Sequence, residues 1–167
     1  MKIEMNAVEN LVNYPNLPKT LKIWLTSFLI VMGLGYCLAV LNVYANTGMT
    51  YKGVADRYNG NEAEQVFAPD FKEIAGIAHT HMGAMGMMFF LMSLPFIFTK
   101  TFPQWLKKFV LVDAFAAVVI ANASFWLIRF AGRPWAVLMI LSGMLLGIAA
   151  GFMVLTPLYE MWLKKTE

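Results

Sequence analysis

Residues 135–158, WAVLMILSGMLLGIAAGFMVLTPL, contain no Asp, Glu, Lys or Arg. A helix needs roughly 20 apolar residues to cross the hydrocarbon core of a bilayer, so this stretch is long enough to span it. Three more apolar stretches of similar length precede it, at about 23–45, 74–98 and 109–128, and Asp113 is the one charged residue that interrupts them. A backbone surrounded by lipid must satisfy its own hydrogen bonds, which favours α-helices. We therefore predict an all-α integral membrane protein, a four-helix up-down bundle over residues 21–163.

The composition agrees with this class. Of the 167 residues, 59% are hydrophobic and 14% are charged, whereas a soluble domain has about 25% charged residues. Mean hydropathy is +0.61. Four spans with short connections use up the whole chain, so we expect a single membrane domain.

Lysine and arginine positions predict the orientation. Of the 13 Lys and Arg residues, eight lie in the N-terminal segment, the second connection and the C-terminus. These are Lys2, Lys19, Lys22, Lys100, Lys107, Lys108, Lys164 and Lys165. Because positive charge gathers on the cytoplasmic side, we expect a bacterial inner (cytoplasmic) membrane protein with both termini cytoplasmic. Residues 1–20 are then a cytoplasmic lead-in and 46–70 an outer loop. This bias explains the basic pI without any nucleic-acid partner.

The outer loop carries helix signals. Thr50 is a candidate N-cap for a helix that Asn59-Gly60 ends. Asp70 and Glu73 have the spacing of a capping box, which predicts that the next helix begins outside the hydrocarbon. We expect the loop to form an ordered cap, with four aromatic residues as anchors: Tyr51, Tyr58, Phe67 and Phe71.

The chain has 2 histidines, His79 and His81, at the start of the second span. Residues two apart on a helix point about 200° apart, so the two imidazoles belong to different faces. His79 shares its face with Gly76, Gly83 and Gly86, which leaves room for a flat macrocycle or a close helix. We therefore expect His79 to point into a helix–helix or helix–cofactor contact and to be the better axial ligand for a haem.

The other face is a stripe of soft donors. His81, Met85, Met88 and Met92 follow one another at helical spacing, and thioethers suit Cu(I). The candidate metal ligands are therefore His79, His81, Met82, Met85 and Met88. Methionines also fill gaps in helix cores, so packing is the alternative interpretation of this stripe.

Two arginines and one carboxylate complete the candidate site. Arg129 and Arg133 flank the turn after the third span, at the depth of His79, where guanidinium groups suit haem propionates or lipid phosphates. Asp113 lies near the cytoplasmic end of the third span, as a proton or quinone-site residue or as a side chain that reaches the interface. Cys37 is expected to be a buried, inert thiol.

Several function classes are excluded or disfavoured. The sequence has no hydrolase motif, phosphate-binding loop, cysteine pair or carboxylate dyad, so we do not expect a self-contained enzyme. A bis-histidine haem within one chain is also excluded, because both histidines lie on opposite faces of one helix. A haem would need a methionine or a ligand from another subunit.

Short motifs carry a family resemblance. Asn46-Thr-Gly-Met-Thr50, Tyr58-Asn-Gly60 and His79-Thr-His81-Met82 resemble a group of small bacterial four-helix membrane proteins over residues 45–95. That group has a His-x-His motif in its second span and accompanies respiratory cytochromes. This chain departs from the group in having Thr80 between the histidines, where an aromatic residue is expected, and in its many methionines. The resemblance implies a respiratory or electron-transfer context.

Three hypotheses follow. The first is an integral subunit of a respiratory electron-transfer complex that places a histidine at or near a haem on the outer side. Its partners would be larger membrane or periplasmic redox subunits such as cytochromes, with quinone as a further candidate. The second is a copper-binding or copper-transfer protein that uses the His/Met stripe. The third is a cofactor-free structural subunit whose Gly143, Gly147 and Gly151 row packs against a partner.

Overall fold

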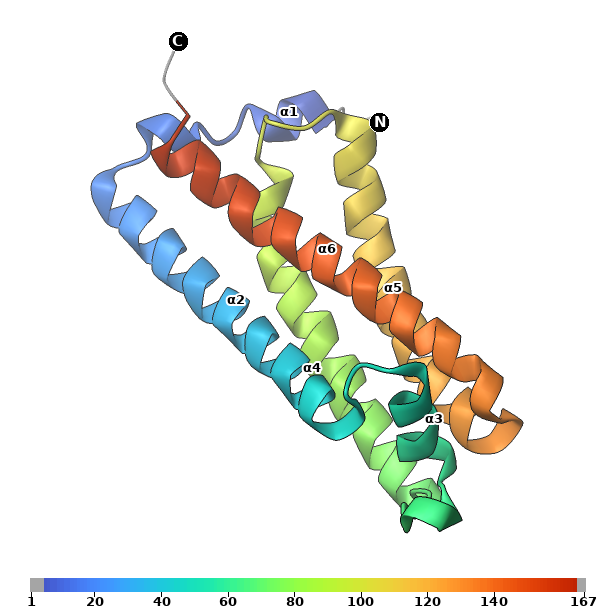
Figure 1. Cartoon of the computed structure of the whole chain (residues 1–167). Helices are drawn as coiled ribbons and strands as arrows, with labels where there is room; N and C mark the ends of the chain where they lie inside the picture. The colour runs from blue at the N-terminus through green and yellow to red at the C-terminus, as the bar shows by residue number, and fades with distance from the viewer. Residues whose placement is uncertain (1–4, 165–167) are drawn as a thin grey trace.

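The structure, a computed structural model, describes residues 5–164 and shows four long antiparallel helices (Figure 1). The α-helices are α1 (Met5–Glu9), α2 (Lys19–Thr47), α3 (Tyr51–Asn59), α4 (Phe71–Ile97), α5 (Gln104–Ala131) and α6 (Ala136–Trp162). Short 3-10 turns are η1 (Tyr14–Asn16), η2 (Glu62–Glu64) and η3 (Arg133–Trp135). Four helices are long and apolar enough to cross a membrane. The predicted all-α membrane bundle is confirmed.

Each long helix overlaps one of the predicted spans: α2 and α5 contain theirs, α4 ends one residue before its span does, and α6 begins one residue after its span does. The two ends of the bundle are rich in polar contacts. We name each end by what it carries. The terminal end holds both ends of the described chain, and the cap end holds α3 (Figure 1). Lys2 and Lys165, which were counted in the charge bias, lie outside the described residues, as do residues 1–4 of the lead-in.

The core lies where α4, α5 and α6 meet. Small side chains on α5 and α6 let these two helices approach closely, and large side chains from α4 fill the remaining space. The buried residues at this junction include Phe89, Met92, Phe96, Ala114, Ala117, Ala149, Ala150 and Met153. Because lipid is as apolar as these side chains, close van der Waals packing holds the three helices together.

Helix α2 is peripheral to this core. Only 6% of its most apolar window is buried, against 44% for α5. Its contacts with α6 include a hydrogen bond from Trp162 Nε1 to Thr26 Oγ1 at 2.8 Å. Cys37 is exposed, so the prediction of a buried thiol was wrong. The reason is that most of α2 has no neighbouring helix to cover it.

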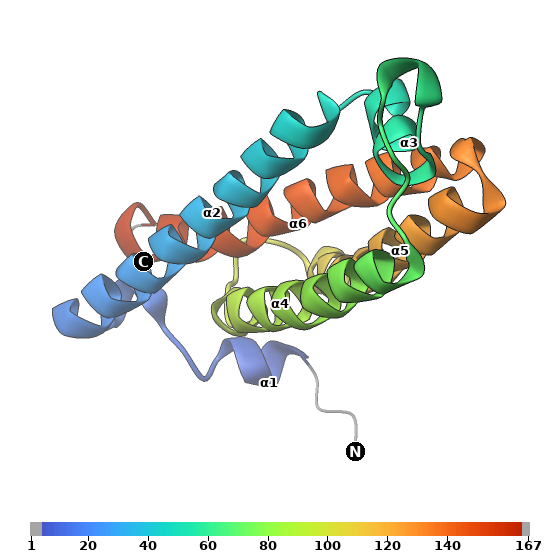
Figure 2. The same ribbon diagram turned by 90° about the horizontal axis from the view of Figure 1, so that it is seen from below.

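The N-terminal segment closes the terminal end of the bundle. The Tyr14 hydroxyl donates to the Pro95 carbonyl at 2.6 Å, which joins η1 to α4. Burial, together with the negative charge of Glu160, raises the pKa of Tyr14 above its ordinary value, so the phenol stays protonated. Figure 2 shows α1 beside the end of α4. The N-terminal segment therefore packs against the terminal end of the bundle.

Two charged side chains are buried at this end of the bundle. The Lys107 side chain is fully buried, pairs with Glu9 and donates to the Thr99 carbonyl at 2.6 Å. The Glu160 carboxylate is also buried and accepts from the Lys100 backbone N–H at 2.6 Å. A buried charge is tolerated only with partners of this kind. Lys107 therefore depends on the N-terminal segment.

We predict that Glu9→Gln destabilises the protein by roughly 2–4 kcal/mol, because it leaves a buried ammonium without its counter-charge. The measurement is the midpoint of thermal unfolding in one detergent, with the exposed Glu62→Gln as the matched control. Adding Lys107→Met to the Glu9→Gln protein should recover part of the loss. Equal midpoints for the wild type and Glu9→Gln would contradict the proposed role of this pair.

Candidate functional site

Helix α4 positions both histidines. The Asp70 side chain accepts from the Glu73 backbone N–H at 2.8 Å, and the Glu73 carboxylate accepts from the Asp70 N–H at 3.1 Å. The predicted capping box is therefore present. From this start, α4 runs as an unbroken α-helix through His79 and His81. Because the helix does not unwind there, the two imidazoles lie on different faces.

His81 faces the bundle. Its ring is half-buried and stands edge-on to Phe125 of α5, with 5.3 Å between ring centroids. Its Nδ1 lies 3.0 Å from the Ile77 carbonyl oxygen. A carbonyl can only accept, so the hydrogen bond places the proton on Nδ1 and leaves Nε2 as the free nitrogen of the neutral ring. An orienting bond of this kind is typical of histidines that bind a metal, and the structure has it at His81.

His79 lies on the opposite, exposed side of α4. We call Gly76, His79, Gly83 and Gly86 the glycine face. A Cβ added at any of the three glycines would meet no heavy atom within 4 Å. The helix–helix contact expected for His79 is therefore not made between the described residues of this chain. Instead, the glycine face is open to whatever lies beside the protein in the membrane.

The methionine stripe packs into the core. Met92 is fully buried, and Met85 and Met88 are half-buried against the cluster between α4, α5 and α6. Met82 is 43% exposed and so lies away from the stripe. This arrangement matches the packing interpretation of the stripe. Within the part of the chain that the structure describes, no three His, Cys, Asp or Glu side chains gather as a metal site.

Arg133 is committed to the cap. Its guanidinium pairs with Asp56 of α3, which also accepts from the Asn61 amide at 3.1 Å. These hydrogen bonds and the nearby positive charge hold the pKa of Asp56 below its ordinary value. Arg133 also donates to the Gly60 carbonyl at 3.3 Å. Its use by a ligand would require breaking this set of contacts.

Arg129 keeps more of its charge available. Its Nε donates to the Pro69 carbonyl at 2.6 Å, and its guanidinium lies 5.2 Å from the Phe130 ring centroid. None of the carboxylates in residues 7–164 forms an ion pair with it. Phe125, which touches His81, precedes Arg129 by four residues, or about one helical turn. The guanidinium is therefore within about a turn of the histidine level.

The cap forms as predicted in outline but not in its anchors. The Thr50 hydroxyl accepts from the Gly53 N–H at 3.0 Å and begins α3, and Asn59 donates to the Ile128 carbonyl at 3.0 Å. Tyr58 packs on Phe125 with 5.1 Å between ring centroids.

The other three predicted anchors were wrong: Phe67, Phe71 and Tyr51 are 87%, 67% and 45% exposed. Val54 and Ala55 fill the contact with α5 and α6 instead. Gly53 is required where α3 meets the end of α2, since a Cβ there would lie 1.9 Å from the Thr47 carbonyl oxygen. Val54 and Ala55 therefore dock α3 with Tyr58 beside them. Phe71, although exposed, contacts the Trp126 ring of α5 at 5.2 Å between centroids.

The remaining charged side chains divide between the two ends of the bundle. Asp113 is half-buried on α5 near the terminal end, and no hydrogen bond or ion pair joins it to residues 7–164. Sequence reasoning assigned Lys107 only to a cytoplasmic connection and did not consider Glu160 at all, although both are buried. The sequence signal was weak, because each stands beside the end of an apolar run.

A family model described as a transmembrane helical domain, Aq_1264_TM, matches residues 48–167. The chain belongs to this family. Searches of curated proteins and of solved structures found no match. With the four long apolar helices, the match establishes a multi-pass membrane protein in contact with lipid. The resemblance to a small membrane protein family holds at this level, and the association with respiratory cytochromes stays a prediction.

The limits of the match follow the packing. The Aq_1264_TM match begins after α2 and covers α3 to α6. The same helices form the core cluster and the cap, whereas α2 is largely uncovered. The glycine face, both histidines and both arginines all lie within the matched residues.

We predict that Asp56→Asn loosens the cap at neutral pH. Because the folded pKa of Asp56 is lowered, its stabilising effect is complete above the ordinary value near 3.9 and disappears as pH falls through the folded pKa. Hydrogen exchange of residues 51–59, compared between wild type and variant at each pH, measures this. The variant should exchange faster at pH 7, and the difference should shrink as the pH falls through the folded pKa of Asp56. A difference that stays the same at every pH would contradict the assignment.

Proposed function

We propose that this chain is a small integral subunit of a membrane electron-transfer complex, in which His79 ligates or adjoins a haem held between subunits. The observation that supports this is the glycine face. Its imidazole is exposed, and a Cβ added at any of its three glycines would meet no heavy atom of the other helices within 4 Å. A flat macrocycle can lie against such a surface, and a side chain at any of those glycines would obstruct it. His81 is less open, because it is half-buried and its ring contacts Phe125 of α5.

The chain itself offers few further ligands. His81 packs on Phe125, and Met85, Met88 and Met92 belong to the core. The second axial ligand would therefore come from a partner, such as a larger membrane or periplasmic cytochrome subunit. Electrons would then pass between the haem and quinone, or between the haem and a second redox centre in that partner.

Arg129 is the better of the two arginines for a propionate. Its guanidinium has no ion-pair partner in residues 7–164, whereas Asp56 already neutralises Arg133. Planar guanidinium groups bind carboxylates through two parallel hydrogen bonds. In this proposal Arg129 holds one propionate at the cap end, and Arg133 holds α3 in place beside it.

The proposed setting is the bacterial inner membrane, with both termini in the cytoplasm. The Lys and Arg bias supports this orientation. The cap end, the histidines and Arg129 would then lie toward the outer side, where an outer-face cytochrome could reach them.

The copper alternative is less well supported by the geometry. A conduit along His81, Met85 and Met88 would need their donor atoms free, but these side chains pack on α5 and on the core cluster. Opening the stripe would create a cavity in the best-packed part of the bundle.

We predict that His79→Ala removes most of the Soret absorbance from the complex purified through this chain, because the iron loses an axial ligand. Gly83→Leu should do the same without removing a ligand, since its side chain fills the space of the macrocycle. The matched control is Gly35→Leu on α2, where an added Cβ also meets nothing within 4 Å.

The His81→Ala protein separates the two faces. It should keep its haem, because His81 faces the bundle. Loss of haem from His81→Ala, with full haem in Gly83→Leu, would show that the faces are assigned the wrong way round. Unchanged haem in all three variants, or no haem in the purified wild type, would leave the cofactor-free structural role.

A further inference from the structure

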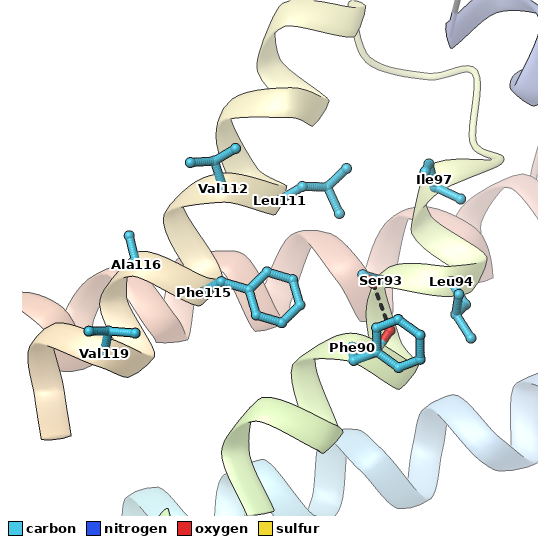
Figure 3. A pocket seen from close by; sticks show the side chains of 9 residues that line it. All are labelled: Phe90, Ser93, Leu94, Ile97, Leu111, Val112, Phe115, Ala116 and Val119. Carbon is cyan, nitrogen blue, oxygen red and sulfur yellow. Dashed lines mark hydrogen bonds between the residues drawn. The ribbon is translucent and has the colours of Figure 1, made fainter. Parts of the chain in front are cut away.

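A second site lies on the lipid-facing side of the bundle, nearer the terminal end. A groove of about 680 Å³ runs between α4 and α5 (Figure 3). Its walls are apolar, with Phe90 and Leu94 on one side and Val112, Phe115 and Val119 on the other. One hydroxyl lines it, that of Ser93, and it already donates to the Phe90 carbonyl at 2.6 Å. The groove is therefore suited to a hydrocarbon chain.

A lysine precedes the groove residues of α5 by about one helical turn. Lys108 precedes Leu111, Phe115 and Val119 by 3, 7 and 11 residues, so all four side chains share one face of α5. Lys108 is exposed, and its ammonium forms no ion pair or hydrogen bond with residues 7–164. By contrast, its neighbour Lys107 is buried and paired with Glu9. Lys108 therefore presents an unneutralised charge about one turn before the apolar groove, on the same face of α5.

The dimensions match one leaflet. From Lys108 to Val119, α5 rises roughly 16 Å at 1.5 Å per residue, which is about half of a hydrocarbon core of roughly 30 Å. Trp105, which is 70% exposed at the start of α5, marks the level where aromatic side chains meet the headgroups. A molecule with an anionic head at Lys108 would thus have its acyl chain along the whole groove.

We propose that this groove binds an anionic phospholipid of the leaflet at the terminal end. The Lys108 ammonium pairs with the phosphate, and one acyl chain fills the space between α4 and α5. This site is independent of the proposed haem, which lies toward the cap end. Charge complementarity at Lys108 selects the lipid, and the apolar walls hold it.

The test uses the full chain in detergent and native mass spectrometry. Phosphatidylglycerol and phosphatidylcholine with identical acyl chains are the two probes. The wild type should retain phosphatidylglycerol about fivefold better, the effect expected of one lysine beside an anionic lipid. Lys108→Gln should bring the two lipids to equal retention. Val112→Trp, a change at a 70% exposed position, should reduce retention of both lipids by filling the groove.

Two control variants on α2 test whether the effects are specific to the groove. Lys19→Gln removes an exposed lysine from the terminal end of α2, and Val31→Trp adds bulk at a position on α2 that is 64% exposed. Both control variants should retain the two lipids as the wild type does. Glycerol phosphate, which has the anionic head but no acyl chain, should displace neither lipid from the wild type. The proposal is overturned if Lys108→Gln keeps the preference or if Lys19→Gln loses it equally. It is also overturned if a second copy of the chain occupies the groove and excludes lipid.

Discussion

The absence of water in the hydrocarbon core is the constraint on which the rest of this structure depends. Polar groups in that layer must find partners within the protein. Ser124 and the Asn122 amide nitrogen accordingly donate to backbone carbonyls one turn earlier on α5, at 2.7 and 2.8 Å. The Asn122 Oδ1 is the exception among the described residues, because it is buried and accepts no hydrogen bond. The paired charges are moved to the two ends of the bundle. There, Lys107 pairs with Glu9 under the N-terminal segment, and Asp56 pairs with Arg133 under the cap.

This sorting leaves some charged side chains without an ion pair in the part of the chain that the structure describes. Lys108 at the terminal end and Arg129 at the cap end are cations without a counter-charge among residues 7–164. His79 is an exposed imidazole beside glycines that no neighbouring helix covers. Glycine on an exposed helix face weakens the helix without improving any contact within the chain. The cost is understandable if a cofactor or partner lies there, and this is why we place the function on the glycine face.

The spans were predictable because the bilayer excludes charge, and residues 135–158 contain none. Local signals predicted the cap equally well: Thr50 does begin α3, and Asp70 with Glu73 does begin α4. The direction in which each face of α4 points was not predictable. A helix on the surface of a soluble protein has a polar face that its sequence pattern reveals. In a membrane helix, both the lipid-facing side and the packed side are apolar, so the pattern does not distinguish them. The sequence pattern therefore placed His79 in a contact, whereas His81 is the histidine that packs on Phe125.

Long-range pairs were also beyond the reach of the sequence. Nothing local connects Glu9 with Lys107, which lie 98 residues apart, and the lead-in read simply as a cytoplasmic tail. The exposure of Cys37 has a similar origin, because the length of α2 predicts a span but not how many neighbours that span has. The Aq_1264_TM match, which begins after α2, is consistent with the peripheral place of that helix.

The most direct measurement of the central claim is an electron-microscopy map of the native complex purified through this chain. It should show a haem lying flat against Gly76, Gly83 and Gly86, with its iron at bonding distance from a nitrogen of His79. A partner subunit should supply the opposite axial ligand. A map in which acyl chains alone cover the glycine face, with no haem near either histidine, would contradict the proposed electron-transfer role.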